Sequence, residues 1–422
     1  MKIIGIIAEY NPFHNGHAYQ IKKIKEDLQA DFVVIAMSGD FVQRGAPAII
    51  DKYTRAKMAL SCGADLIIEL PVLWSTASAE YFAMAGITLF DKMGCVDGIC
   101  FGAETDDLDA LSAIADVLVC EPDDYRTALA SYLKSGMSFP MARSKALCGF
   151  LANDELSSIL NEPNNILAIE YLKALKRRNS SMTPYVIKRE GAGYHDETIA
   201  DDTSCHAPTA SATAIRLALD THISTEEAYI SDALVNAMPA PALEVLKDYL
   251  TEKSLVYSND FSSILGYKLL SSDISVLANI GDSNPELANR LFKNRMNFSS
   301  FEQFCELNKS KDVTYTRVSR VLLHLILNIS NQDYQFGKEL DYIPYLRILG
   351  FRKDATALLK ELKNASKVPV ISKLADASSL LDSNILKLLD KDIFAADLYE
   401  QVCANKSGMA SISDYSQNII LL

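Results

Sequence analysis

Short apolar runs alternate with amphipathic segments through the first hundred residues of the chain. The runs cover residues 2–10, 31–38, 65–72 and 96–104, and residues 183–190 form one more. Apolar runs at this interval, separated by helical patterns, are typical of βαβ units in which helices cover both faces of a parallel sheet. The pattern therefore predicts an α/β fold with a doubly wound parallel sheet of the Rossmann-like type, whose ligands bind beyond the carboxyl ends of the strands.

The pattern becomes helical after residue 106. The clearest amphipathic stretch is PNNILAIEYLKALKRR at 163–178, and SATAIRLALD at 211–220 indicates the start of another helix. Beyond residue 222 the apolar residues keep the i, i+3, i+4 spacing of helices, with little sign of strands. We therefore expect an α/β domain over residues 1–222 and a mainly α-helical domain over residues 223–422.

Composition adds the features of a globular intracellular protein. The 422 residues are 49% hydrophobic and 23% charged, which is typical of globular chains with more than one domain. The eight cysteines form no C-x-x-C pair and no secretory segment follows Met1, so we expect reduced thiols and a cytoplasmic location. The longest apolar runs, such as LLHLILNI at 322–329, are too short to span a membrane.

The net charge of −13 argues against polyanionic partners unless basic side chains are concentrated locally. Residues 290–320 hold seven basic and three acidic side chains, and residues 347–367 hold six and two. Such runs either form solvated helix faces or bind phosphates. The RNA candidates in the first window are Arg290, Lys293, Arg295, Arg317 and Arg320, with Tyr315 available for stacking on a base. The basic residues of the second window are Arg347, Arg352, Lys353, Lys360, Lys363 and Lys367.

The first apolar run ends in EYNPFHNGH, residues 9–17, which carries two of the six histidines. If the first strand ends at Tyr10, His14 and His17 lie at the start of the next helix, where free N–H groups and the helix dipole favour anions. Two imidazoles there supply donors to a phosphate on which charge develops. Gly16 has no side chain, which would let a flat base approach the backbone. The alternative is an Asn-Gly turn with two surface histidines.

An H-x-G-H pattern after the first strand resembles the nucleotidyltransferase superfamily. Its members usually carry a second phosphate-binding element, S-T-x-I-R, and Ser211, Thr213, Ile215 and Arg216 in SATAIR are similar to it. A hydroxyl-rich helix start followed by arginine is suited to bind a leaving pyrophosphate. The alternative is a capped helix with a solvated arginine.

The resemblance becomes closer along the chain, because eight segments keep their order and spacing. They are GIIAEYNPFHNGH (5–17), SGDFVQRGAPAIIDKYTRAKMAL (38–60), ELP (69–71), FGAE (101–104), PNNILAIEYLKAL (163–175), IKREGAGYHD (187–196), TYTRVSRVLLHLIL (314–327) and LRILGF (346–351). Together they look like the bacterial tRNA(Met) cytidine acetate ligases, over most of the chain.

That resemblance implies an ATP-dependent ligase. Acetate and ATP would form acetyl-adenylate with loss of pyrophosphate, and the acetyl group would pass to N4 of the wobble cytidine (C34) of elongator tRNA(Met). Attack of a carboxylate on the α-phosphorus needs positioning and charge neutralisation rather than a protein nucleophile. The implied ligands are ATP with Mg²⁺, acetate and elongator tRNA(Met), and we expect neither a protein metal site nor a membrane partner.

The resemblance also implies which residues bind ATP. The catalytic pair would be His14 and His17. The ATP contacts would be Ile7, Ala8, Glu9, Tyr10, Asn11, Pro12, Phe13, His14, Asn15, Gly16, His17, Ala18, Tyr19 and Gln20, then Gly102, Asn164 and Arg189, and also Ser211 and Arg216. Taken alone, Gly102 is equally a turn residue, Asn164 a helix cap and Arg189 a solvated side chain.

A second polar segment follows the second strand. Our hypothesis is that the acetate and phosphate side, or the incoming cytidine, contacts Asp40, Gln43, Arg44, Lys52 and Arg55. The alternative is that Asp51 and Arg55 form an i,i+4 pair at a helix start.

The chain departs from the family pattern at three places, none of which touches His14 or His17. Gln20 stands where a histidine is expected, Ala103 stands where serine is common, and SATAIR is a weaker version of the usual element. Two other functions stay open at this point. They are an adenylyltransferase for a small phosphorylated metabolite and a non-catalytic RNA-binding protein on the same fold.

Overall fold

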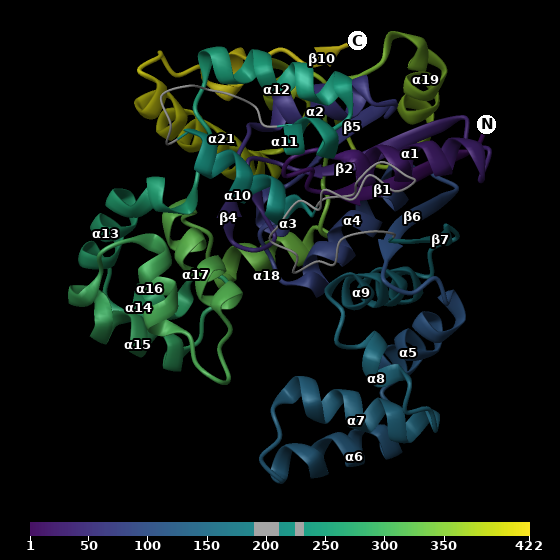
Figure 1. Ribbon diagram of the computed structural model, residues 1–422, viewed down its shortest axis with the longest axis vertical. Coiled ribbons are helices and arrows are strands. Elements are labelled where there is room, and N and C mark those ends of the chain that lie inside the picture. The colour runs from purple at the N-terminus through teal and green to yellow at the C-terminus, as the bar shows by residue number, and fades with distance from the viewer. Residues whose placement is uncertain (190–210, 224–231) are drawn as a thin grey trace.

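The computed structural model describes residues 1–189, 211–223 and 232–422, and its centre is an eight-stranded sheet (Figure 1). The strand order is β10-β8-β5-β2-β1-β6-β7, with β9 paired to β8. The strands are β1 (Ile3–Ala8), β2 (Phe32–Ser38), β5 (Leu66–Leu70), β6 (Gly98–Ala103), β7 (Thr183–Lys188), β8 (Leu346–Phe351), β9 (Val370–Ile371) and β10 (Ile420–Leu421), and β3 (Phe41–Val42) and β4 (Ala46–Pro47) form a separate pair. The five strands expected from the apolar runs are thus confirmed.

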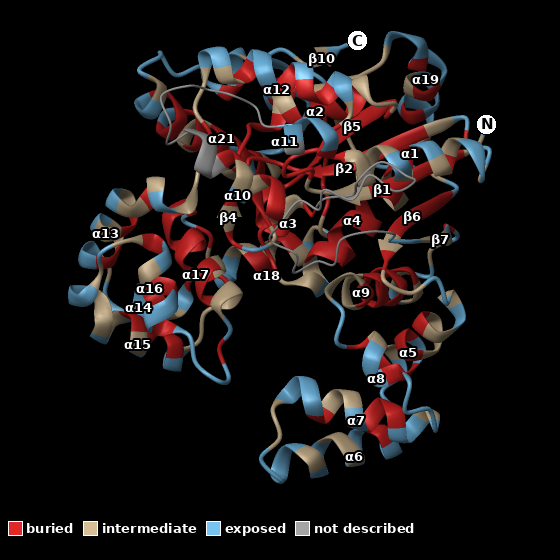
Figure 2. Cartoon of the chain, in the orientation of Figure 1, coloured by how far each residue is buried: buried red, intermediate tan, exposed pale blue. Residues whose placement is uncertain are grey.

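Side chains of the central strands alternate between two apolar layers, since successive residues of a strand point to opposite faces. In β2, Val33 and Ile35 pack with α1, α2, α10 and α12, whereas Val34 and Ala36 pack with α4 and α9. Figure 2 shows that the strands are buried between these helices. The doubly wound arrangement is therefore confirmed.

The helices occupy most of the remaining described chain. They are α1 (Asn15–Glu26), α2 (Lys52–Ser61), α3 (Val72–Ser75), α4 (Ala79–Met93), α5 (Leu108–Cys120), α6 (Asp123–Lys134), α7 (Phe139–Leu151), α8 (Leu156–Ile159), α9 (Pro163–Arg178), α10 (Ala212–Ile223), α11 (Asp232–Ala237), α12 (Ala240–Glu252), α13 (Ser262–Ser271), α14 (Ile274–Asn279), α15 (Pro285–Asn294), α16 (Phe301–Asn308), α17 (Tyr315–Leu327), α18 (Asn331–Glu339), α19 (Thr356–Ala365), α20 (Ala377–Leu380) and α21 (Ser383–Ser407). In the described part of the chain, none of these helices combines the length and the apolar character needed to cross a membrane.

The chain after residue 222 completes the sheet, which the sequence pattern did not predict. β8 pairs antiparallel with β5, and β9 and β10 pair parallel with β8. The sheet is therefore mixed, and the expected boundary at residue 222 does not separate the sheet from the helices. A six-residue apolar run such as LRILGF cannot be distinguished by periodicity from a buried helical turn, and its partner strand β5 lies almost 280 residues earlier.

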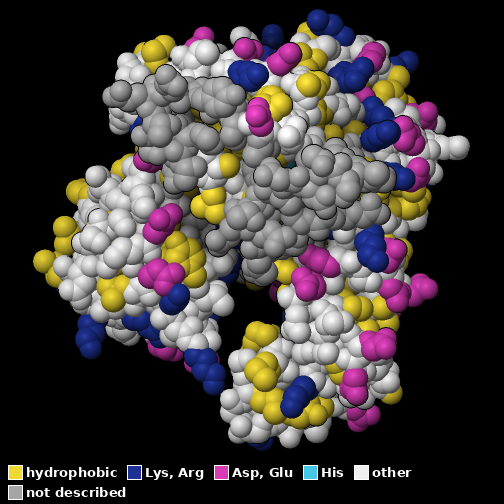
Figure 3. Space-filling model, in the orientation of Figure 1, with side chains coloured by type: hydrophobic (Ala, Val, Ile, Leu, Met, Phe, Trp, Pro, Cys, Tyr) yellow, Lys and Arg dark blue, Asp and Glu magenta, His cyan; other side chains and the backbone are white. Residues whose placement is uncertain are grey.

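Two helical lobes extend from the same side of the sheet (Figure 1). One is the helical module, residues 258–327, which contains the 3₁₀ turn η1 (Ser258–Phe261) and helices α13 to α17. The other is the arm, residues 123–151, which consists of α6 and α7. Figure 3 shows an open gap between the module and the arm.

Candidate active site

A cavity of about 470 Å³ lies where β1 and β6 end, at the point where the strand order reverses. Sheets of this type bind ligands at such a switch point. Thirteen of the predicted ATP contacts line the cavity: Ile7, Ala8, Glu9, Tyr10, Asn11, His14, His17, Gln20, Gly102, Asn164, Arg189, Ser211 and Arg216. The structure therefore brings together five segments that are distant in sequence.

The remaining residues of the predicted run do not line this cavity. They are Pro12, Phe13, Asn15, Gly16, Ala18 and Tyr19. Phe13 is fully buried in the apolar layer under α1, and Asn15 donates from its amide to the carbonyl of Asn236 at 2.7 Å. These six residues belong to the loop after β1 and the first turns of α1, whereas His14 and His17 of the same stretch face the cavity. The stretch GAGYHD at 191–196 lies outside the described residues.

The two histidines are oriented by backbone donors. Nδ1 of His14 accepts from the N–H of Gly16 at 3.1 Å, and Nδ1 of His17 accepts from the N–H of His14 at 3.3 Å. Both imidazoles therefore carry their proton on Nε2, and the rings stack with centroids 3.7 Å apart. Burial lowers the pKa of His14 to about 3, with a further contribution from Arg189 and Arg216, and burial also holds the pKa of His17 well below its usual value. The site thus presents two neutral N–H donors.

Gly16 lies against the His14 imidazole, a contact that the sequence did not reveal, and the approach of an adenine base to its backbone stays a prediction. A side-chain carbon built at Gly16 would lie 3.0 Å from Cε1 and 3.1 Å from Nδ1 of the His14 imidazole. The missing side chain therefore leaves room for the folded-back imidazole that caps α1.

Three arginines surround the cavity. Arg216 donates to the carbonyl of Asn11 at 2.8 Å and to Oγ1 of Thr213 at 3.0 Å, so it is not the solvated side chain of the alternative reading. Burial lowers the pKa of Arg216, Arg189 and Arg44, although all three stay cationic. Ser211 caps α10 by accepting from the N–H of Ala214 at 3.0 Å.

The loop after β6 is clamped to the first turn of α9. Glu104 accepts from the N–H groups of Asn164 at 3.3 Å and of Asn165 at 2.8 Å. In return, the side-chain oxygen of Asn165 accepts from the N–H groups of Glu104 and Thr105. The cap of α9 is therefore a carboxylate from another segment, and Asn164 lines the cavity instead of acting as the cap. Gly102 lies beside this clamp, where a side-chain carbon would lie 3.3 Å from Cγ of Arg189.

The loop after β2 supplies two of the five proposed substrate residues. Gln43 and Arg44 line the cavity, and the N–H of Gln43 donates to the Glu9 carboxylate at 2.9 Å. Arg55 is fully buried away from the cavity and donates to the carbonyls of Ile50, Glu9, Ser38 and Gly39. The Arg55 guanidinium therefore joins the loops that follow β1 and β2. It contacts neither the cavity, as the substrate hypothesis expected, nor the Asp51 carboxylate, as the alternative expected.

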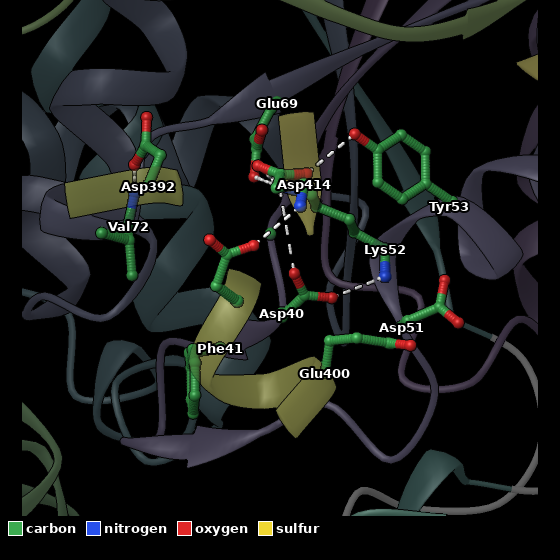
Figure 4. Close-up of polar contacts among 12 residues, drawn as sticks. Asp40, Phe41, Asp51, Lys52, Tyr53, Glu69, Val72, Asp392, Glu400 and Asp414 are labelled. Atoms are coloured by element: carbon green, nitrogen blue, oxygen red, sulfur yellow. Dashed lines mark hydrogen bonds and ion pairs between the residues drawn. The ribbon is translucent and has the colours of Figure 1, made fainter. Parts of the chain in front are cut away.

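Asp40 and Lys52 also lie away from the cavity, in a buried charge network (Figure 4). The Lys52 ammonium lies 2.8 Å from Glu69 and 3.2 Å from Asp414. Arg347 lies 3.0 Å and 2.8 Å from the same two carboxylates. Burial raises the pKa of Asp40 to about 7. The placement of Lys52 and Asp40 in the core is a correction to their expected role as substrate ligands.

Five of the six arginines in the basic windows lie close to acids of the same chain. Arg290 lies 3.0 Å from Glu286, and Arg320 lies 2.6 Å from Asp282, which is also 3.7 Å from Arg317. Arg295 covers the ring of Phe292, Tyr315 is half-buried, and Lys293 is exposed. In the second window Arg347 is buried in the network described above, so it cannot contact RNA. Local sequence reveals the i,i+4 pair of Arg290 and Glu286 within α15, but not the pairs of Arg317, Arg320 and Arg347, whose acids lie in distant segments.

Other cavity residues carried no signal in the sequence. The module contributes Ser258 and Glu302, and Tyr257 directly precedes it. An apolar wall is made by Phe82, Phe101, Leu167 and Tyr171. The Glu302 carboxylate is oriented by the amide of Asn259 at 2.9 Å. Only the tertiary structure places these side chains beside the HNGH turn.

Within the described residues, no group of three or more His, Cys, Asp or Glu side chains is arranged to hold a metal ion. A Mg²⁺ ion that accompanies a nucleotide is held mainly by phosphate oxygens and water, with one or two carboxylates. Glu9 and Glu302 line the cavity and are suited to that task.

Comparisons with known proteins agree with this geometry. The HIGH Nucleotidyl Transferase family model matches residues 1–413. The tRNA(Met) cytidine acetate ligase of Thermoanaerobacter sp. (strain X514) is 42% identical over 408 residues, which cover 96% of this chain and 97% of that protein. The ligase of Acetivibrio thermocellus is 37% identical over 424 residues, which cover 100% of both chains.

Two solved structures match this chain over its whole length. The crystal structure of apo Thermotoga maritima TmcAL matches with a TM-score of 0.89 and 29% identity over 100% of both chains. The structure of the same protein bound with alpha-thio ATP matches with a TM-score of 0.88 and 28% identity, again over 100% of both chains. The chain therefore belongs to the HIGH nucleotidyltransferases and, within them, to the tRNA(Met) cytidine acetate ligase family.

Proposed function

We propose that this protein activates acetate with ATP and transfers the acetyl group to N4 of the wobble cytidine of elongator tRNA(Met). The observation that carries this proposal is the cavity itself. It combines the N-termini of α1 and α10, two neutral imidazole donors and three arginines, which together suit a triphosphate. Its opposite side is formed by the helical module, which leaves space for a second substrate.

The first step requires charge neutralisation at phosphorus. An acetate oxygen bonds to the α-phosphorus of ATP while the bond to the β-phosphate oxygen breaks, so that acetyl-adenylate and pyrophosphate form. In this proposal Arg216 and Arg189, which line the cavity, bind the leaving pyrophosphate, and His14 and His17 donate to oxygens on which charge increases. Gln43 and Arg44, which also line the cavity, would lie beside the acetate.

The second step transfers the acetyl group. The cytidine N4 attacks the acetyl carbonyl, AMP leaves with the bonding electron pair, and one N4 proton is lost. Glu302 is a carboxylate at the module side of the cavity, and carboxylates accept from the cytosine amine. The binding of tRNA by side chains of the module is part of this proposal. Of the RNA candidates in the first basic window, Lys293 is the exposed one.

The test is acetate-dependent pyrophosphate exchange, followed by transfer of labelled acetate to tRNA(Met) in the presence of Mg²⁺. We expect exchange without tRNA and acetylcytidine with it. His14→Asn should reduce exchange about 100-fold at an unchanged melting temperature, since removing one preorganised donor costs about that much. Pyrophosphate release that does not require acetate would favour the adenylyltransferase instead, and absence of nucleotide binding would favour a non-catalytic RNA-binding protein.

A further inference from the structure

The arm combines positive charge with exposed apolar side chains. The arm, residues 123–151, contains four basic residues, Arg126, Lys134, Arg143 and Lys145, against two acidic residues, Asp123 and Asp124, in a chain whose net charge is −13. Such a stretch is a local exception to the acidity of the whole molecule. It lies outside the two basic windows and outside the cavity.

The arm has a buried inner side and an apolar outer side. Tyr125, Ala146 and Leu147 are buried and join the main core. By contrast, the exposed fraction is 56% for Phe139 and 57% for Met141, and Leu133 and Phe150 are also exposed. Figure 3 shows hydrophobic side chains gathered on this lobe beside the gap. Large apolar side chains that cluster on a surface mark an interaction site.

The charges of the arm are available for a partner. Arg126 pairs with Asp123, but the ion pairs among the described residues involve neither Lys134, Arg143 nor Lys145. Lys134 and Lys145 are exposed, and the Lys145 ammonium lies 5.9 Å from the centre of the Tyr132 ring. The outer side therefore offers two exposed cations, one of which lies next to a half-buried aromatic ring.

The arm is connected through α8 and α9 to one wall of the cavity. The chain passes from α7 through α8 to α9, whose first turn places Asn164 on the cavity wall. Glu302 lies on the wall formed by the module. A macromolecule that inserts one residue into the cavity between these walls would lie against the arm.

We propose that the arm is a second RNA-docking surface, which binds unpaired nucleotides of the substrate tRNA. Lys134, Arg143 and Lys145 contact phosphates, and Phe139 stacks on a base. RNA loops present unstacked bases and phosphates together, which matches a surface of cations and an aromatic ring. The proposal rests on the proposed function, because the cavity must receive a base of that RNA. An anionic membrane surface is the competing occupant, and the test below includes it.

The experiment compares two double variants of the full-length protein with the same change in net charge. Lys134→Glu with Lys145→Glu changes the arm, and Lys22→Glu with Lys247→Glu changes exposed lysines of α1 and α12, on the far side of the sheet. We measure the Kd for tRNA(Met) at several salt concentrations, pyrophosphate exchange without tRNA, and cosedimentation with phosphatidylglycerol vesicles. Phe139→Ala is measured alongside and tests stacking without a change of charge.

We expect the arm double variant to raise the Kd about 10-fold or more and to reduce the slope of log Kd against log salt by about 1.5, because each lost phosphate contact contributes about 0.7 to 0.9. Phe139→Ala should raise the Kd about 5- to 100-fold. Pyrophosphate exchange should stay unchanged in all variants, and the control double variant should bind tRNA like the parent.

The proposal is overturned if the arm variants bind tRNA like the parent, or if they lose vesicle binding while tRNA binding is kept. Failure of the proposed function looks different. In that case the parent itself shows no acetate-dependent exchange and no acetylcytidine, whatever the arm variants do to the Kd for tRNA.

Discussion

His14 and His17 act as neutral hydrogen-bond donors because the fold removes their charge. Each Nδ1 accepts from a backbone N–H, and burial beside Arg189 disfavours the imidazolium. A neutral donor approaches a polyanion without having to lose a proton, and its orientation does not depend on pH over the neutral range.

The lowered pKa of His14 predicts a pH dependence of stability. In the unfolded chain the imidazole binds a proton near pH 6.5, whereas in the folded protein its pKa is about 3. The unfolded state therefore binds more protons as the pH falls below 6.5, so stability is lost on acidification. Between pH 8 and pH 5, His14 should lower the free energy of unfolding by about 2 kcal/mol.

Urea unfolding of the parent and of His14→Gln at both pH values checks this prediction. The parent should lose about 2 kcal/mol more than the variant between pH 8 and pH 5, since glutamine does not titrate. An equal loss in the two proteins would show that His14 is protonated in the folded state at pH 5.

Gly16→Ala should separate ATP binding from stability. Alanine is about 1 kcal/mol better than glycine in a helix, but its side chain would lie 3.0 Å from the His14 imidazole and push it aside. We expect an unchanged or higher melting temperature and a KM for ATP in pyrophosphate exchange that rises about 10-fold. Gly149→Ala in α7 is the matched control, because nothing lies within 4 Å of its added carbon, and it should leave this KM unchanged.

At the scale of elements, the site is built from helix ends and strand ends that hold one another. The carboxylate of Glu104 after β6 caps α9, and the guanidinium of Arg55 in α2 binds carbonyls at the ends of β1 and β2. Such cross-element contacts fix the loops that line the cavity, because each loop satisfies the free backbone groups of its neighbour.

Glu104→Ala should therefore cost about 1 kcal/mol of stability and also weaken ATP binding, since it frees the N–H groups of the first turn that carries Asn164. Glu162→Ala is the control, because Glu162 precedes the same helix and makes no capping bond. Chemical denaturation and the KM for ATP measure the two effects. Equal values for both variants would contradict a capping role of Glu104.

At the scale of the whole molecule, a buried charge network joins segments more than 300 residues apart. Lys52, Glu69, Arg347 and Asp414 come from α2, β5, β8 and the last residues of the chain. Two cations facing two carboxylates compensate charges that burial alone would strongly disfavour. The network explains why the C-terminal segment belongs to the same unit as the first strands.

Asp414→Asn should lower the free energy of unfolding by about 3–5 kcal/mol at pH 7, because Lys52 and Arg347 would lose half of their buried negative partners. Lys52 and Arg347 hold the pKa of Asp414 below its usual value, so this contribution is present above the unfolded pKa of 3.8 and is lost as the pH falls further. Thermal denaturation measures the effect, with Asp390→Asn on the exposed side of α21 as control. Equal melting temperatures would show that the network contributes no net stability.

Much of the nucleotide side of the site was predictable from the sequence. The alternation of apolar runs predicts the strands, and HNGH after the first strand predicts an anion site at a helix start, because both depend on neighbouring residues. Gly102, Asn164 and Arg189 followed from the resemblance, and the structure places them at the same cavity. Lys52 and Arg55 were misinterpreted, since their partners are carboxylates and carbonyls whose positions depend on the tertiary fold.

The sequence by itself thus determined the α/β order, the phosphate-binding turn and, through resemblance, the family. Only the tertiary structure decided that β8 and β10 join the sheet, that Arg317, Arg320 and Arg347 are paired with distant acids, and that the arm faces the module across a gap. The physical reason is the separation in sequence between the residues that determine each feature. Local periodicity and helix ends are encoded within a few residues, whereas charge pairing, strand partners and cavity walls arise from residues that folding brings together.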